Sequence, residues 1–178
     1  VDGIIAQTNE QAIFLKKYYR READAVVANF HPLPTEEIKK GPGVKITWVA
    51  NFKTWKKPET FVRLAKDLQL LGKLVECIMI GSPWHDDKKQ IQFEQATANI
   101  LNLRYLGPQP IESVNAVLAV SDIFVNTSLS EGFANTFIQA WMRKVPVISL
   151  HCNPDGIFDN QQVGYFAGEY RKMLAQVV

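Results

Sequence analysis

Residues 44–72 read "VKITWVANFKTWKKPETFVRLAKDLQLLG" and contain a strand, a loop and a helix in succession. The opening residues are apolar or β-branched, which is typical of a strand buried on both faces of a parallel sheet. The helix begins with Pro58 in its first turn and ends before Gly72, as the preferences of these two residues for helix termini predict. A strand joined through a short loop to a helix is the basic unit of α/β proteins.

The same alternation continues along the chain. Strands are expected in "ECIMIG", "LRYLG", "DIFVNTS" and "VPVISL", with helices between them in "DDKKQIQFEQATANIL", "IESVNAVLAVS" and "NTFIQAWMRK". Repeated strand–helix units with short connections fold with right-handed crossovers. We therefore predict an α/β fold with a doubly wound, mostly parallel, Rossmann-like sheet.

The first 43 residues have a different organisation. A strand in "DGIIAQ" precedes a helix that begins near Thr8, where Thr8 and Gln11 have the spacing of a capping box. A second strand in "DAVVANF" leads into a loop rich in proline and glycine, the best candidate boundary in the chain. We predict a connecting segment over residues 1–43 and a domain over residues 44–178. Because the chain lacks an initiator methionine and stops within a helical pattern, we expect that domain to be truncated at both ends.

Composition narrows the class of protein. Of the 178 residues, 47% are hydrophobic and 21% are charged, which is typical of a soluble globular protein. A net charge of +2 gives no argument for nucleic acid, and no apolar run approaches the ~20 residues of a membrane-spanning helix. Cys77 and Cys152 lie in apolar surroundings and are expected to be buried thiols in a reducing compartment, so the expected location is the cytoplasm.

Ligands of open parallel sheets bind beyond the carboxyl ends of the strands. The loop after the first strand of the domain carries Lys53, Lys56 and Lys57, and the loop after the fourth carries Glu131 in "SEGFANTF". Gly132 permits a close turn, and the residues that follow offer N–H groups at a helix start, which carries about half a positive charge and binds phosphate. A carboxylate suits sugar hydroxyls rather than phosphate. The combination suits a nucleotide diphosphate joined to a sugar.

Each of these residues has a plainer interpretation. Lysines after a strand are often solvated charges, and "SEG" before a helix is often a cap. His31, His85 and His151 have no partner readable from the sequence, and the spacing around His85 lacks the further ligands of a metal site. The sequence contains no GxGxxG, Walker loop or GxSxG elbow, which argues against a dinucleotide oxidoreductase, a P-loop NTPase and a serine hydrolase.

The order of these segments, from "VANFKTWKKPETFVRLAKDL" through "SLSEGFANTFIQAWMRKVPVIS" to "NPDGIFDNQQVGYF", resembles a known family. It is similar to the carboxyl-terminal domain of retaining glycosyltransferases with the two-domain GT-B fold, in family 4, the glycosyl transferases group 1. Residues 1–43 resemble the connection out of the amino-terminal domain. The resemblance covers about the whole chain.

The resemblance assigns roles to individual residues. Glu131 matches the catalytic-site glutamate that contacts the donor sugar, and Gln139 stands where relatives have a second glutamate that binds the ribose. Lys56 matches the phosphate-binding lysine, whereas Asn51 replaces the family's arginine and Lys53 is a candidate substitute. The diphosphate cradle at the helix start matches Gly132, Phe133, Ala134, Asn135 and Thr136.

The implied activity is that of a hexosyltransferase (EC 2.4 type) in the intact protein, with a nucleotide diphosphate sugar as donor and no cofactor or metal. The implied acceptor is a glycan or a lipid-linked molecule held by an amino-terminal domain absent from this chain, with peripheral membrane contact through that domain. The isolated fragment is expected to be inactive. Two alternatives stay open: a non-catalytic nucleotide-binding or scaffold domain, which the replacements at Asn51 and Gln139 favour, and a GT-B epimerase.

Overall fold

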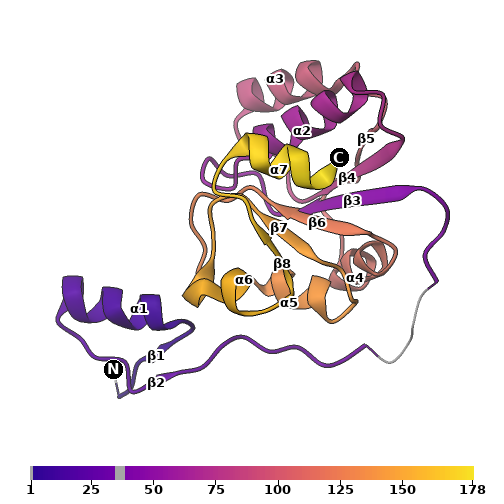
Figure 1. The fold of residues 1–178 in the computed structure, drawn as a ribbon. Coiled ribbons are helices and arrows are strands. Elements are labelled where there is room, and N and C mark those ends of the chain that lie inside the picture. Colours follow the sequence, from indigo (N-terminus) through magenta and orange to yellow (C-terminus); the bar gives the residue numbers. More distant parts are fainter. Residues whose placement is uncertain (1, 35–38) are drawn as a thin grey trace.

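A six-stranded parallel sheet organises the larger part of the molecule (Figure 1). The computed structural model describes residues 2–34 and 39–178. The strand order is β5-β4-β3-β6-β7-β8, with every neighbouring pair parallel. The strands are β3 (Val44–Val49), β4 (Val75–Ile80), β5 (Leu103–Tyr105), β6 (Ile123–Asn126), β7 (Val147–Ser149) and β8 (Gly164–Phe166).

Helices cover both faces of this sheet, as the prediction of a doubly wound fold requires. Helices α2 (Pro58–Leu70), α3 (Asp87–Thr97) and α7 (Tyr170–Val177) lie on one side in Figure 1. Helices α4 (Ile111–Ala119), α5 (Asn135–Trp141) and α6 (Ile157–Asn160) lie on the other, and a 3₁₀ turn (Pro154–Gly156) precedes α6. Each face has its own apolar cluster.

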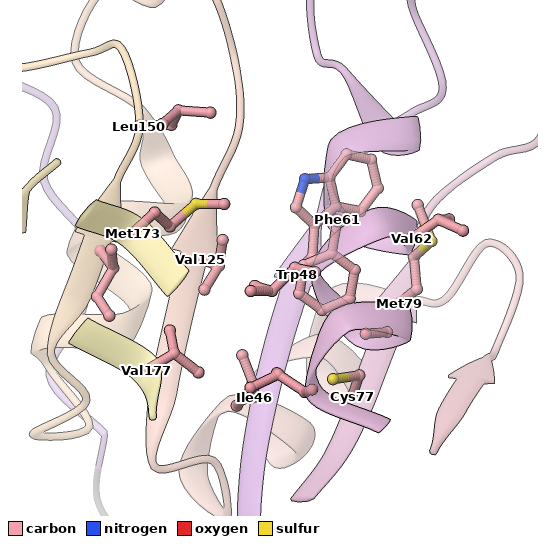
Figure 2. Close-up of a cluster of buried hydrophobic side chains, with 14 of the residues drawn as sticks. Ile46, Trp48, Phe61, Val62, Cys77, Met79, Val125, Leu150, Met173 and Val177 are labelled. Atoms are coloured by element: carbon pink, nitrogen blue, oxygen red, sulfur yellow. The ribbon is translucent and has the colours of Figure 1, made fainter. Parts of the chain in front are cut away.

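The central strand β3 anchors the first of these clusters (Figure 2). Trp48 is 2% exposed and stacks on Phe61 of α2, with ring centroids 6.3 Å apart. Met173 and Val177 of α7 belong to the same cluster and lie across β3 from Phe61 in Figure 2. Burying side chains of this size stabilises a fold by roughly 1.5–3 kcal/mol each, so this cluster contributes substantially to the stability of the domain.

The predicted elements between residues 44 and 150 are all present. Helix α3 ends at Thr97, earlier than the apolar pattern predicts, because residues 98–102 turn into β5. Strand β8 and helix α6 were not predicted, since both are too short to carry a clear periodicity. The terminal helical pattern corresponds to α7.

Residues 2–34, here called the amino-terminal unit, form a small separate layer (Figure 1). It contains β1 (Ile5–Ala6), α1 (Asn9–Phe14), a π-helical turn (Leu15–Tyr19) and β2 (Ala25–Val26), which pairs in parallel with β1. The Thr8 hydroxyl caps α1 by accepting from the N–H of Gln11 at 3.0 Å, as predicted. The Gln11 side chain, however, accepts from the N–H of Gln7 rather than completing a capping box. Part of the predicted boundary loop, residues 35–38, lies outside the described residues.

Candidate functional site

A cavity of about 530 Å³ opens at the carboxyl ends of the parallel strands. It lies where sheets of this kind bind ligands. The loops after β3, β4, β5 and β6 supply its walls, and the amino-terminal unit supplies one further side. It is lined by Gln7, Asn29, Val49, Ala50, Asn51, Lys53, Lys56, Ile80, Gly81, Ser82, Pro108, Gln109, Val114, Glu131, Gly132, Phe133, Ala134, Asn135 and Thr136.

The loop that carries Lys56 is fastened to the core. The Trp48 indole donates to the Thr127 hydroxyl at 2.8 Å, and that hydroxyl lies 2.7 Å from the carbonyl of Lys56 and 3.0 Å from that of Lys57. The N–H of Leu129 also donates to the carbonyl of Trp55. The loop after β6 therefore fixes the backbone of the lysine loop after β3.

Glu131 and Lys56 meet inside the cavity and form an ion pair. The Ser128 hydroxyl donates to the same carboxylate oxygen of Glu131 at 2.6 Å. Asn126 in turn holds Ser128, because its amide oxygen accepts from the Ser128 N–H at 3.2 Å. The side chains of Lys56 and Glu131 are 22% and 13% exposed, so both charges face a partly enclosed space. The site thus presents a cation and a carboxylate acceptor side by side.

Helix α5 begins at the cavity wall. Ala134 is its N-cap, and no side chain within the described part of the chain caps it. The first residues of the helix, Asn135 and Thr136, line the cavity. A helix start carries a partial positive charge and offers N–H donors to an anion. Lys56 and the start of α5 therefore give the cavity two sources of positive potential.

Two glycines allow close approaches around the cavity. Gly81 has φ +150°, and a Cβ there would lie 1.8 Å from the carbonyl oxygen of Ala50, so β4 and β3 could not end side by side with a larger residue. Gly132 has a different role from the one expected. Its backbone needs no left-handed conformation, but a Cβ would lie 2.2 Å from the Gln11 amide nitrogen. The glycine makes room for the amino-terminal unit.

Most of the residues selected from the sequence gather in this cavity. Its lining includes Glu131, Lys56, Lys53, Asn51, Gly132, Phe133, Ala134, Asn135 and Thr136. Asn51, in the position of the family's arginine, accepts from the N–H of Ser82 at 3.2 Å. Lys53 lies over the ring of Trp55, 5.0 Å from its centroid. Gln139, in α5, does not line the cavity, and its side chain is buried. Its role toward a ribose stays a prediction.

Sequence reasoning missed two groups of lining residues. Gln7 and Asn29 come from the amino-terminal unit, which was interpreted as a connecting segment. Pro108 and Gln109 follow β5, in a loop to which the sequence assigned no role. An asparagine directly after a strand, in "VVANF", was the available signal for Asn29.

The remaining polar candidates give no second site. Cys152 is buried and its thiol donates to the carbonyl of Ser128 at 3.1 Å; burial, together with the nearby Glu131 carboxylate, raises its pKa to about 11. Among residues 2–34 and 39–178, no three His, Cys, Asp or Glu side chains gather as metal ligands do. No helix within those ranges has the length and apolar character needed to cross a membrane.

Residues 43–178 match the sequence family described as glycosyl transferases group 1. The match covers well over half of the chain. This chain belongs to that family. A search of curated proteins gives no significant match.

Solved structures show the same fold. S. aureus TarM, as a mutant in complex with fondaparinux, alpha-GlcNAc-glycerol and UDP, matches 99% of this glycosyl transferases group 1 chain with a TM-score of 0.82 and 17% identity. The pneumococcal O-GlcNAc transferase GtfA, in complex with UDP and GlcNAc, has a TM-score of 0.71 over 99% of the chain at 17% identity. Anabaena HepE, in complex with UDP and glucose, has a TM-score of 0.72 over 98% at 13% identity.

These structures are GT-B glycosyltransferases, which confirms the predicted fold class. The chain spans only part of each one: 36% of the TarM chain, 38% of the GtfA chain and 52% of the HepE chain. Identities of 13–17% support the fold and the placement of the sheet. They do not transfer a substrate.

Proposed function

We propose that this glycosyl transferases group 1 chain binds the nucleotide diphosphate sugar of a retaining hexosyltransferase. The observation that carries the proposal is the meeting of Lys56, Glu131 and the start of α5 in one cavity. Solved structures with the same fold contain UDP with a sugar, which supports a nucleotide diphosphate as the ligand class. The acceptor would be a glycan or a lipid-linked molecule, held by a part of the protein outside this chain.

The chemistry of transfer explains why these groups belong together. Breaking the bond between sugar and diphosphate leaves negative charge on the departing phosphate oxygens, so positive groups fixed beside them lower the barrier. Lys56 and the N–H groups at the start of α5 would stabilise that charge. Glu131, already oriented by Ser128 at 2.6 Å, would accept from hydroxyls of the sugar. The Lys56 side chain and the backbone N–H groups of this chain would then provide the charge stabilisation without a metal or cofactor.

A second candidate is a nucleotide-binding domain without transferase activity. The cavity carries Asn51 where relatives have an arginine, and the Asn51 side chain is engaged by the Ser82 backbone. A site with one cation fewer would bind a nucleotide diphosphate yet stabilise its departure poorly. Affinity therefore tests the site, and turnover of the full-length protein separates the two candidates.

The test of binding is calorimetry with UDP, GDP and ADP and with their sugars. We expect one of these diphosphates to bind, and Lys56→Ala to weaken it by about 10- to 100-fold, the range for a charge-assisted hydrogen bond. Lys57→Ala is the matched control, because Lys57 is the adjacent lysine, pairs with Glu59 at 3.5 Å and lies outside the cavity lining. Absence of binding by the parent chain at millimolar concentrations would refute the proposal.

Glu131→Gln separates recognition of the sugar from recognition of the nucleotide. The variant keeps the size of the side chain but removes the charge that neutralises Lys56. We expect free diphosphate to bind equally well or more tightly, and the nucleotide sugar to lose its advantage over the free nucleotide. Weaker binding of both to the same extent would contradict the assignment of Glu131 to the sugar.

A further inference from the structure

Three side-chain amides of the amino-terminal unit surround the loop that carries Glu131. The Asn29 side chain donates to the carbonyl of Phe133 at 2.9 Å. Gln7 donates to the amide oxygen of Asn29 at 2.8 Å, which fixes the Asn29 amide with its nitrogen toward Phe133. The Gln11 amide oxygen accepts from the Gln7 N–H at 2.8 Å. These hydrogen bonds connect the amino-terminal unit to the loop of residues 131–133.

Asp155 fastens this unit to the sheet domain. Its carboxylate accepts from the Asn9 N–H at 2.9 Å, from the Asn9 side chain at 3.0 Å and from the Glu10 N–H at 3.1 Å. These are the first residues of α1, where a carboxylate is favoured by both hydrogen bonding and the helix dipole. Asp155 holds a left-handed backbone with φ 50°, which aspartate tolerates better than most residues. The clamp lies at the turn before α6, far from the unit in sequence.

Gly132 shows how closely the two parts fit. The Gln11 amide nitrogen occupies the space that a Cβ would need, and its other end is held by the Gln7 N–H. Gln11 therefore has little freedom to move aside. A larger residue at position 132 would have to displace the Gln11 amide, so glycine favours docking of the unit as it is seen.

We propose that Asn29 is a positioning residue of the donor site and that Asp155 is the clamp that keeps it in place. This proposal rests on the proposed function and deepens it. Asn29 orients the carbonyl of Phe133, and a peptide group has one plane, so the N–H of Ala134 at the start of α5 is oriented with it. Gln7 and Asn29 also line the cavity directly. The amino-terminal unit is in this way part of the donor site.

The first experiment compares Asn29→Ala with Phe30→Ala, a matched control because Phe30 is the next residue and is 86% exposed. Hydrogen exchange in peptides covering residues 129–137 needs no ligand. We expect Asn29→Ala to accelerate exchange there by about fivefold to tenfold, the size of effect of one hydrogen bond, and to leave β6 unchanged. UDP affinity, or that of whichever diphosphate binds the parent, should weaken by about the same factor. Phe30→Ala should leave both unchanged.

The second experiment tests the clamp with Asp155→Asn against Asp159→Asn. Asp159 lies on the same segment and accepts from Asn153, away from α1. Asp155→Asn should accelerate exchange over residues 129–137 and weaken diphosphate binding by about fivefold to tenfold, the same factor as Asn29→Ala, because it acts through the Asn29 hydrogen bond. Both residues act through docking of the same unit. The double variant Asn29→Ala with Asp155→Asn should therefore bind the diphosphate no more weakly than the single variant with the lower affinity.

The outcomes separate this inference from the proposed function. If the parent chain binds no diphosphate, the proposed function fails, and with it the inference about its donor. If the parent binds and Asn29→Ala binds equally well, the inference alone fails. A fall in melting temperature without faster exchange at residues 129–137 would also overturn it, because it would show a role in the fold and not in positioning. Independent, multiplying effects of the two substitutions would overturn the role of Asp155 as a clamp.

Discussion

The sheet domain and the amino-terminal unit are held together by different forces. In the domain, β3, β4 and β6 bury apolar side chains on both faces, and the largest of them are at most 2% exposed. Of the described residues in the unit, Ala6 and Thr8 are the buried ones, while Phe14, Tyr18, Tyr19 and Phe30 are exposed. The domain is stabilised by burial; the unit is attached through hydrogen bonds to Asp155 and Phe133. The attached part can therefore change position at much lower cost than the domain.

The largest effect is expected from Trp48→Ala. The substitution leaves a cavity beside Phe61 and removes the hydrogen bond to Thr127, so the free energy of unfolding should fall by about 3–5 kcal/mol. Ile13→Ala in the unit, where the side chain is 65% exposed, should change it by less than about 0.5 kcal/mol. Urea unfolding of both variants measures the contrast. Similar losses in the two would mean that the unit also contributes a buried core.

The next effect is expected from Gly81→Ala. The added Cβ meets the Ala50 carbonyl at 1.8 Å, and the backbone there is unfavourable for alanine. The loss of stability should exceed about 1–2 kcal/mol, the cost of a left-handed backbone alone. Gly72→Ala is the control, because it has φ 65° with nothing within 4 Å of the new Cβ. Thermal unfolding measures the stability of both variants. A larger loss of stability in Gly72→Ala than in Gly81→Ala would contradict this account.

Limited proteolysis addresses the unit itself. Lys16 and Arg20–Arg21 lie at exposed positions around the π-helical turn, and segments with few buried contacts open at low free energy. Trypsin should first cut within residues 16–21 and leave the sheet domain intact, as mass spectrometry of the products would show. Asp155→Asn should speed this first cut by about tenfold or more, the size expected for loss of a charge-assisted hydrogen bond. If the first cuts fell within α2, the sheet domain would open more readily than the amino-terminal unit, contrary to this prediction.

The smallest effect concerns the thiols of the domain. Burial raises the pKa of Cys77 to about 12 and that of Cys152 to about 11. At pH 8 about one Cys152 thiol in 1,000 would be ionised, so a thiol reagent should not react with the native protein. The stability that goes with these raised pKa values is fully present below the unfolded thiol pKa of about 8.5 and is lost as the pH rises toward the folded values. Rapid modification at pH 8 would show that the domain opens locally.

The sheet could be predicted from the sequence because short buried apolar runs alternate regularly with amphipathic helical stretches. The loop residues Lys56 and Glu131 could also be placed together, since the carboxyl ends of parallel strands share one edge. The contribution of Asn29 could not be predicted, because its contact with Phe133 spans 104 positions and depends on how the amino-terminal unit docks on the sheet domain. Gln139 lies in helix α5 as predicted, but its side chain is buried and is not part of the cavity lining, so its role toward a ribose stays a prediction.

The hydroxyl of Thr127 has a consequence for how such a site evolves. It connects the indole of Trp48, deep in the domain, to the backbone carbonyls of Lys56 and Lys57. A substitution at Trp48 would therefore disturb the proposed phosphate site as well as the packing, so selection for the proposed activity and selection for stability would act on the same position. Gln109, on a loop outside this set of bonds, lines the same cavity and donates to the carbonyl of Leu106 three residues away. Point mutations at Gln109 could therefore change the ligand preference of the cavity without disturbing the hydrogen bonds that hold the proposed phosphate site.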